Sequence, residues 1–95
     1  MDYLLDLGFT NLELDNLKET LNPEIKSMVI EFPKIVAVNY QYLNNLGISN
    51  LKEVFTNHTK MFLLNPDNFK SIFDKYDEAD LVRCIEKNAA VVEKL

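Results

Sequence analysis

The chain has 95 residues, of which 47% are hydrophobic and 26% are charged, and this length and balance are typical of one folded domain. It has no apolar run of about 20 residues that could cross a membrane, no basic leader, and one cysteine, which excludes an internal disulfide. We therefore expect an intracellular, cytoplasmic protein. Fifteen acidic against ten basic residues give a net charge of −5, which disfavours nucleic acid as a partner.

The first third of the chain contains two clear helix starts. Thr10 with Glu13 is a capping-box pair, in which each residue satisfies a free backbone N–H of the other. Asn22 before Pro23 predicts a second helix start. The asparagine side chain can accept from a free backbone N–H of the first turn, and proline suits the first helical position because no N–H is needed there. The first unit of the chain therefore contains either an inserted helix or two overlapping half-units.

The signals that follow predict a break and a new helix. The Phe32-Pro33 pair predicts a helix end, because the residue before proline disfavours the α conformation. Residues 34–38 are then expected to be an apolar connector, with Asn39 as the N-cap of the next helix. Gly47 is expected to end that helix, since glycine enters the left-handed conformation at little cost.

The centre of the chain predicts the second helix of a hairpin. Asn50 with Glu53 forms a box-like cap at its start. Leu51, Val54 and Phe55 follow at spacings of three and four, so they form one apolar stripe.

The last third repeats these signals. Asn65 with Pro66 starts one helix, and Asp77 caps the last one. The predicted helices cover roughly residues 3–8, 11–20, 23–32, 40–46, 51–58, 66–76 and 78–88. The residues expected to be buried are Leu43, Leu46, Leu51, Val54, Phe55, Ile72, Phe73, Leu81 and Ile85.

Three segments align without gaps, which indicates a helical repeat. They cover residues 25–39, 51–65 and 81–95, and each combines an apolar helical stripe with a following apolar run. The aligned stripe positions are Ile25, Leu51 and Leu81; Met28, Val54 and Cys84; and Val29, Phe55 and Ile85.

We therefore predict an all-α, short helical-repeat (solenoid-like) domain of about three helix-turn-helix units, roughly residues 1–38, 39–64 and 65–95. The last unit stops at a repeat boundary without a polar capping helix, so we expect it to leave apolar surface uncovered. The residues expected on that surface are Ala89, Val91, Val92 and Leu95. We therefore expect self-association or a protein partner at the C-terminal end.

The repeat resembles that of the mitochondrial transcription termination factor (mTERF) family, in which a short helix ending in Leu-Gly precedes a second helix and a short apolar turn. The residues that carry the resemblance are Leu43, Leu46, Gly47, Leu51, Val54 and Phe55; Ile25, Met28, Val29, Phe32, Pro33, Ile35 and Val36; and Leu81, Cys84, Ile85, Val91 and Val92. The resemblance implies a curved stack of repeats, and nucleic-acid binding along a basic concave surface.

No pattern in the sequence indicates an enzyme, a cofactor or a metal. His58 is expected to be a helix-terminal residue without a catalytic partner, and Cys84 a small buried side chain. Residues 74–80 form an acidic cluster, which capping and solvation explain without a bound cation.

Four lysines occupy equivalent positions of the repeat and would line up in rows. Lys26 matches Lys52, and Lys34 matches Lys60. Such rows could contact phosphates, although solvated lysines are the simpler interpretation. The expected function is a non-enzymatic helical-repeat interaction module that binds a protein partner, with nucleic-acid binding through a lysine-lined concave surface as the alternative.

Overall fold

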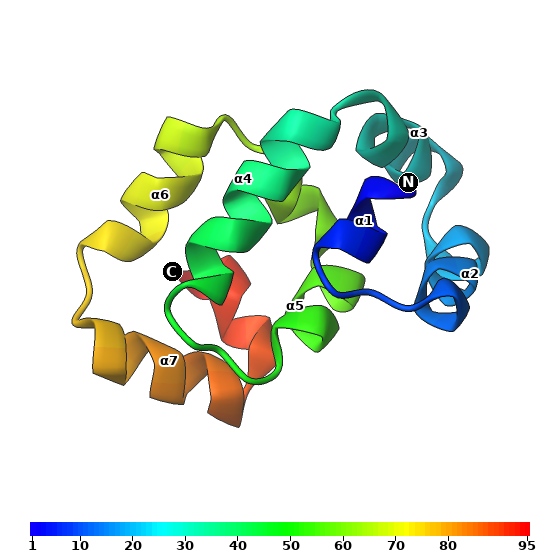
Figure 1. The fold of residues 1–95 in the computed structure, drawn as a ribbon. Coiled ribbons are helices and arrows are strands. Elements are labelled where there is room, and N and C mark those ends of the chain that lie inside the picture. The colour runs from blue at the N-terminus through cyan, green and yellow to red at the C-terminus, as the bar shows by residue number, and fades with distance from the viewer.

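The computed structural model describes residues 1–95 and confirms an all-α fold, with seven α-helices, two 3₁₀ helices and no strand (Figure 1). No helix is long and apolar enough to pass through a bilayer. The elements are α1 (Tyr3–Asp6), α2 (Asn11–Thr20), α3 (Pro23–Glu31), α4 (Pro33–Asn44), α5 (Leu51–Asn57), η1 (Thr59–Leu63), α6 (Pro66–Asp74), α7 (Glu78–Lys87) and η2 (Ala89–Lys94).

Helix α4 lies at the centre of the molecule and contacts α1, α3, α5, α6 and η1. Figure 1 shows α4 crossing between α6 on one side and α1 and α3 on the other. Its buried face follows the helical period, with Val36, Tyr40 and Leu43 at i, i+4 and i+7. Because α4 has neighbours around much of its circumference, it organises the packing of the other helices.

The prediction that Asn39 caps a helix, with residues 34–38 as a connector, was wrong. Pro33 stands at the first position of α4, so the helix begins there and includes residues 34–38. Asn39 is buried inside this helix, and its Nδ2 donates to the carbonyls of Phe62 at 3.0 Å and Leu64 at 2.8 Å. The side chain therefore joins α4 to the end of η1, which only the tertiary structure could reveal.

Four predicted side-chain caps are confirmed, and the two predicted at Asn39 and Asn50 were wrong. The confirmed caps are Thr10, Asn22, Asn65 and Asp77, each accepting from a first-turn N–H. Asn50 makes no such bond at the start of α5; instead its Nδ2 donates to the Ile85 carbonyl of α7 at 3.0 Å. Gly47 lies in the turn before it, with a φ of +86° that favours glycine.

The loop before α5 is held by α7. The N–H of Ser49 donates to a carboxylate oxygen of Glu86 at 2.8 Å. The hydroxyl and N–H of Ser49 hold the pKa of the Glu86 carboxyl below its usual range. This contact, with the bond from Asn50 to the Ile85 carbonyl, joins the loop before α5 to α7.

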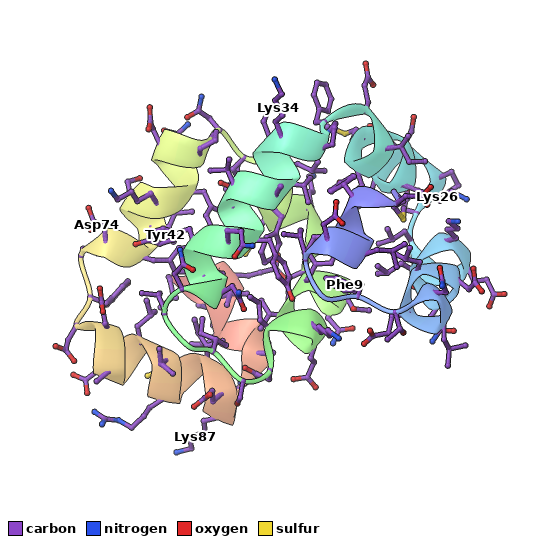
Figure 2. The ribbon with its side chains drawn as sticks, viewed as in Figure 1. Phe9, Lys26, Lys34, Tyr42, Asp74 and Lys87 are labelled. Atoms are coloured by element: carbon purple, nitrogen blue, oxygen red, sulfur yellow. The ribbon has the colours of Figure 1, made fainter.

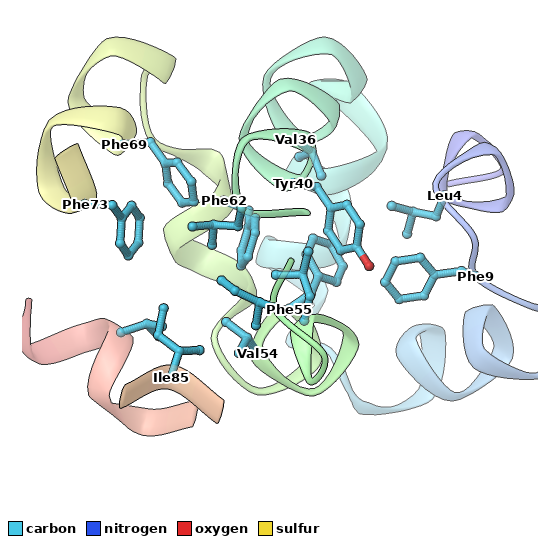
Figure 3. Close-up of a cluster of buried hydrophobic side chains, with 14 of the residues drawn as sticks. Leu4, Phe9, Val36, Tyr40, Val54, Phe55, Phe62, Phe69, Phe73 and Ile85 are labelled. Carbon is cyan, nitrogen blue, oxygen red and sulfur yellow. The ribbon is translucent and has the colours of Figure 1, made fainter. Parts of the chain in front are cut away.

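The hydrophobic core is one cluster of 17 buried residues. A chain of aromatic rings runs through it from the segment after α1 to α6 (Figure 3). Ring centroids lie 5.5 Å apart between Phe9 and Phe55 and 5.0 Å apart between Phe55 and Phe62. The chain continues to Phe69 at 5.3 Å and then to Phe73 at 5.0 Å, all distances typical of favourable ring pairs.

The three aligned segments occupy different depths in the fold. Val29, Phe55 and Ile85 are all fully buried, as their shared position predicts. The neighbouring position is buried only at Val54, whereas Met28 and Cys84 are exposed. Helix α5 is covered by α4, η1 and η2, whereas α3 and α7 lie at the edges of the domain.

This difference corrects the prediction that Cys84 is buried, because α7 lies at the edge of the domain. Leu46 and Ile72 were expected to be buried but are only partly so, although both pack against the core. The apolar runs after α5 and α7 form η1 and η2, whereas the equivalent run after α3 is the first part of α4.

Candidate interaction surface

Exposed large apolar side chains gather where α3 meets η1. Met28 and Phe32, four residues apart near the end of α3, are 36% and 40% exposed, and Leu64 after η1 is 38% exposed. Scattered apolar side chains are normal on a protein surface, but several on packed neighbouring elements form a patch.

This patch contains a pocket of about 350 Å³, which we call the α3–η1 groove. Its apolar lining consists of Ile25, Met28, Leu63 and Leu64, and its polar rim consists of Asn22, Glu24 and Lys60. An apolar centre within a polar rim is the usual arrangement of a protein contact surface.

Local sequence and long-range hydrogen bonds together place the first wall of the groove. Asn22 caps α3 by accepting from the N–H of Glu24 at 2.8 Å. The opposite side of α3 is fixed by Val29, which is fully buried and whose carbonyl accepts from the Tyr3 hydroxyl at 2.6 Å. Because the Val29 side of α3 faces the domain, Ile25 and Met28 are left along its edge.

The second wall of the groove is equally well held. Asn39 of α4 binds the carbonyls of Phe62 and Leu64, on either side of Leu63. Phe62 is buried, so the backbone that carries Leu63 and Leu64 is fixed from beneath. The groove therefore has a preformed shape, which lowers the ordering cost of binding.

The two charged residues of the rim make no ion pair within the chain. Glu24 stands on the α3 wall and Lys60 on the η1 wall, and both are exposed. The ion pairs of the molecule are Lys52–Glu13, His58–Glu93 and Arg83–Asp80. Both rim charges are thus available to an incoming molecule.

The predicted lysine rows have different environments in the structure. Lys52 is paired with Glu13 at 3.0 Å and lies 5.5 Å from the centre of the Phe9 ring. The N–H of Thr10 and the ammonium of Lys52 hold the pKa of the Glu13 carboxyl below its usual range.

The other three lysines are also distributed over separate places. The ammonium of Lys26 donates to the carbonyl of Lys18 at 3.4 Å, Lys34 is exposed on α4, and Lys60 borders the groove. Figure 2 shows Lys26 beside α3 and Lys34 on the outer side of α4, well separated from each other.

The C-terminal residues pack onto the domain itself. Val92 is only 1% exposed and belongs to the core, and Val91 and Leu95 are partly buried against it. The Tyr76 hydroxyl donates to the carbonyl of Leu95 at 3.3 Å, and η2 contacts both α5 and α7. Little of the apolar surface expected at this end is therefore free.

His58 has a partner that its sequence spacing does not reveal. Its Nδ1 contacts the carboxylate of Glu93 from η2, while its side chain is 12% exposed. The pair connects the end of α5 to the C-terminal 3₁₀ helix. No group of three or more histidine, cysteine, aspartate or glutamate side chains is arranged to hold a metal ion.

The groove residues were not identified from the sequence as a site. Met28 aligns with Val54, and the helical period alone does not distinguish a helix at the edge of a domain from one at its centre. The only groove residue among the predicted surface residues is Lys60.

Fold and surface define an all-α domain with one aromatic core and a preformed apolar groove at its edge. No family model, no curated protein and no solved structure matches this chain.

Proposed function

We propose that this chain is a non-enzymatic interaction module that binds a protein partner through the α3–η1 groove. The observation that carries the proposal is the apolar lining, in which Met28 and Leu64 are exposed, on walls held in place by hydrogen bonds. Covering this lining removes apolar surface from water, which favours association by about 25 cal/mol for each Å².

The groove suits a protein better than a polyanion. Its rim carries one acidic and one basic residue, and its centre is apolar. Phosphate recognition needs several clustered bases, and of the four aligned lysines Lys52 is already paired with Glu13. The resemblance to the mTERF family concerns packing positions, so it supports the helical architecture more than a nucleic-acid partner.

The test is a comparison of the proteins retained by three immobilised forms of the chain: wild type, Met28→Asp and Leu12→Asp. Leu12 is 70% exposed on α2 and serves as the matched control. We expect a stoichiometric partner, confirmed with the purified protein by calorimetry, that binds wild type and Leu12→Asp but not Met28→Asp.

Circular dichroism and urea unfolding establish that Met28→Asp is folded, as its partial exposure leads us to expect. A partner that binds folded Met28→Asp as tightly as wild type would place the binding surface elsewhere and contradict the proposal.

A further inference from the structure

The α3–η1 groove has opposite charges on its two walls. Glu24 belongs to the α3 wall and Lys60 to the η1 wall, and neither is paired within the chain. An interface between two identical subunits related by a twofold axis must be self-complementary, because residue i meets j and j meets i. A surface with an acid on one side and a base on the other meets this requirement.

We infer that the partner that covers the α3–η1 groove is a second copy of this chain. This inference rests on the proposed function, in which the groove binds a protein. In this dimer Glu24 of each copy faces Lys60 of the other, so one residue pair produces two ion pairs. The apolar side chains between them, Met28 and Leu64 foremost, pack across the twofold axis.

The charge pattern favours a second copy over an unrelated partner. A second copy necessarily carries Lys60 and Glu24 at the same separation as Glu24 and Lys60 of the first copy, so both ion pairs can form at once. Methionine is flexible and fills irregular gaps, so Met28 can adapt where two identical surfaces meet. The repulsion between two chains of charge −5 is screened beyond about 8 Å at physiological ionic strength, whereas the contacts at the rim are closer.

The size of the groove predicts a weak dimer. Four apolar side chains and three polar rim residues on each copy form a smaller surface than the roughly 800 Å² per partner of a standard interface. We therefore expect a reversible equilibrium whose dissociation constant lies in the micromolar range or above, visible by sedimentation velocity as concentration is raised.

A charge-swap series tests the inference. Glu24→Lys alone and Lys60→Glu alone each replace two attractive pairs with two repulsive ones, so each should weaken dimerisation about tenfold. A mixture of the two variants restores both attractive pairs and should form a heterodimer at least as tight as the wild-type dimer. The double variant Glu24→Lys/Lys60→Glu should also dimerise like wild type.

Lys87→Glu is the matched control, because Lys87 is an exposed lysine of α7 on the side of the molecule away from α3 (Figure 2). Lys87→Glu changes the net charge as Lys60→Glu does, but it should leave the dissociation constant within about twofold of the wild-type value. Glu24 and Lys60 are both exposed, so all variants should retain the wild-type circular dichroism spectrum.

Two results would overturn the inference: a wild-type chain that stays monomeric up to millimolar concentration, or a dimer that the charge-swap mixture does not restore. Either result leaves the proposed function standing if Met28→Asp abolishes capture of a different protein. The proposed function fails separately if no binding, to itself or to another protein, depends on Met28.

Discussion

Asn39 shows how one polar side chain can join two elements in the centre of an apolar core. It lies on the buried side of α4 between Val36 and Tyr40, where an unpaired amide would be costly. Its Nδ2 instead donates to two carbonyls near the end of η1. The bond geometry thus converts an unfavourable buried amide into a contact that fixes the second wall of the groove.

We expect Asn39→Ala to lower the free energy of unfolding by about 1–3 kcal/mol, because the buried carbonyl of Phe62 and the partly buried carbonyl of Leu64 both lose their hydrogen-bond partner. Urea unfolding followed by circular dichroism measures the change. Asn45→Ala, at an exposed position just after α4, is the control and should change stability by less than about 0.5 kcal/mol. Equal effects of the two substitutions would contradict the role assigned to Asn39.

Tyr40 is a buried residue whose ionisation should make the fold sensitive to alkaline pH. It is 3% exposed, and burial, with a smaller contribution from the Glu13 carboxylate, raises its pKa from 10.0 to about 12. Below pH 10 the phenol is neutral in both the folded and the unfolded chain. Between about pH 10 and 12 only the unfolded chain ionises at this residue, so the free energy of unfolding falls as the pH rises.

Tyr40→Phe should therefore remove part of the alkaline destabilisation. A difference of two pKa units corresponds to about 2–3 kcal/mol, so the stability lost by wild type between pH 10 and 12 should exceed that lost by the variant by an amount of this order. Unfolding curves at several pH values measure this difference. In a titration followed by phenolate absorbance, the Tyr40→Phe variant should lack one ionisation at high pH that wild type shows. Parallel pH profiles for the two proteins would refute the assignment.

At the scale of the elements, α5 is the helix with the most complete cover. Phe55 touches the rings of Phe9, Tyr40 and Phe62 and has no exposed surface. These contacts bring together residues before α2, within α4 and within η1, and Tyr40 provides a second link between Phe9 and Phe62. Cys84 of α7 aligns with Val54 of α5 in the repeat. It is exposed because no other element covers the outer side of α7.

Phe55→Ala should lower the free energy of unfolding by about 3–5 kcal/mol, because it removes a fully buried aromatic ring and leaves a cavity that its neighbours fill only in part. Chemical unfolding monitored by far-ultraviolet circular dichroism tests this. Thr56→Ala, at the next and exposed position of α5, is the control and should be nearly neutral. A loss below about 1 kcal/mol for Phe55→Ala would mean that the core repacks around the missing ring.

At the scale of the whole molecule, charge and shape act together. The domain measures 34 × 24 × 22 Å and has a radius of gyration of 12.7 Å, close to the roughly 12 Å expected for a compact domain of this length. With fifteen acidic and ten basic residues on so small a body, the overall field repels polyanions. The basic side chains are also divided among separate elements, as Lys26 and Lys34 illustrate (Figure 2).

We therefore expect no measurable binding to duplex DNA or RNA at physiological salt. Fluorescence anisotropy with labelled duplexes tests this, and a variant with Lys26, Lys34, Lys52 and Lys60 all replaced by glutamine is the comparison. Micromolar binding that falls steeply with salt and disappears in the quadruple variant would favour the nucleic-acid alternative over a protein partner.

Local signals in the sequence predicted local features well. The caps at Thr10, Asn22, Asn65 and Asp77 and the stripe of Leu51, Val54 and Phe55 each depend on residues within one helical turn or two. The groove could not be predicted in this way, because the exposure of Met28 depends on which elements cover α3. The same limit applies to His58, whose partner Glu93 lies 35 residues away.

The sequence by itself determined that the chain forms helices, where most of them begin and which residues can enter a core, because helical period and capping act over a few neighbouring residues. Only the tertiary structure decided that Asn39 lies inside α4 and binds η1, that Asn50 binds α7, and that α5 is central while α3 and α7 are at the edge. These outcomes depend on contacts between distant segments, since burial is a property of the assembled domain. The α3–η1 groove belongs to this second group, because its two walls are more than 30 residues apart in the chain.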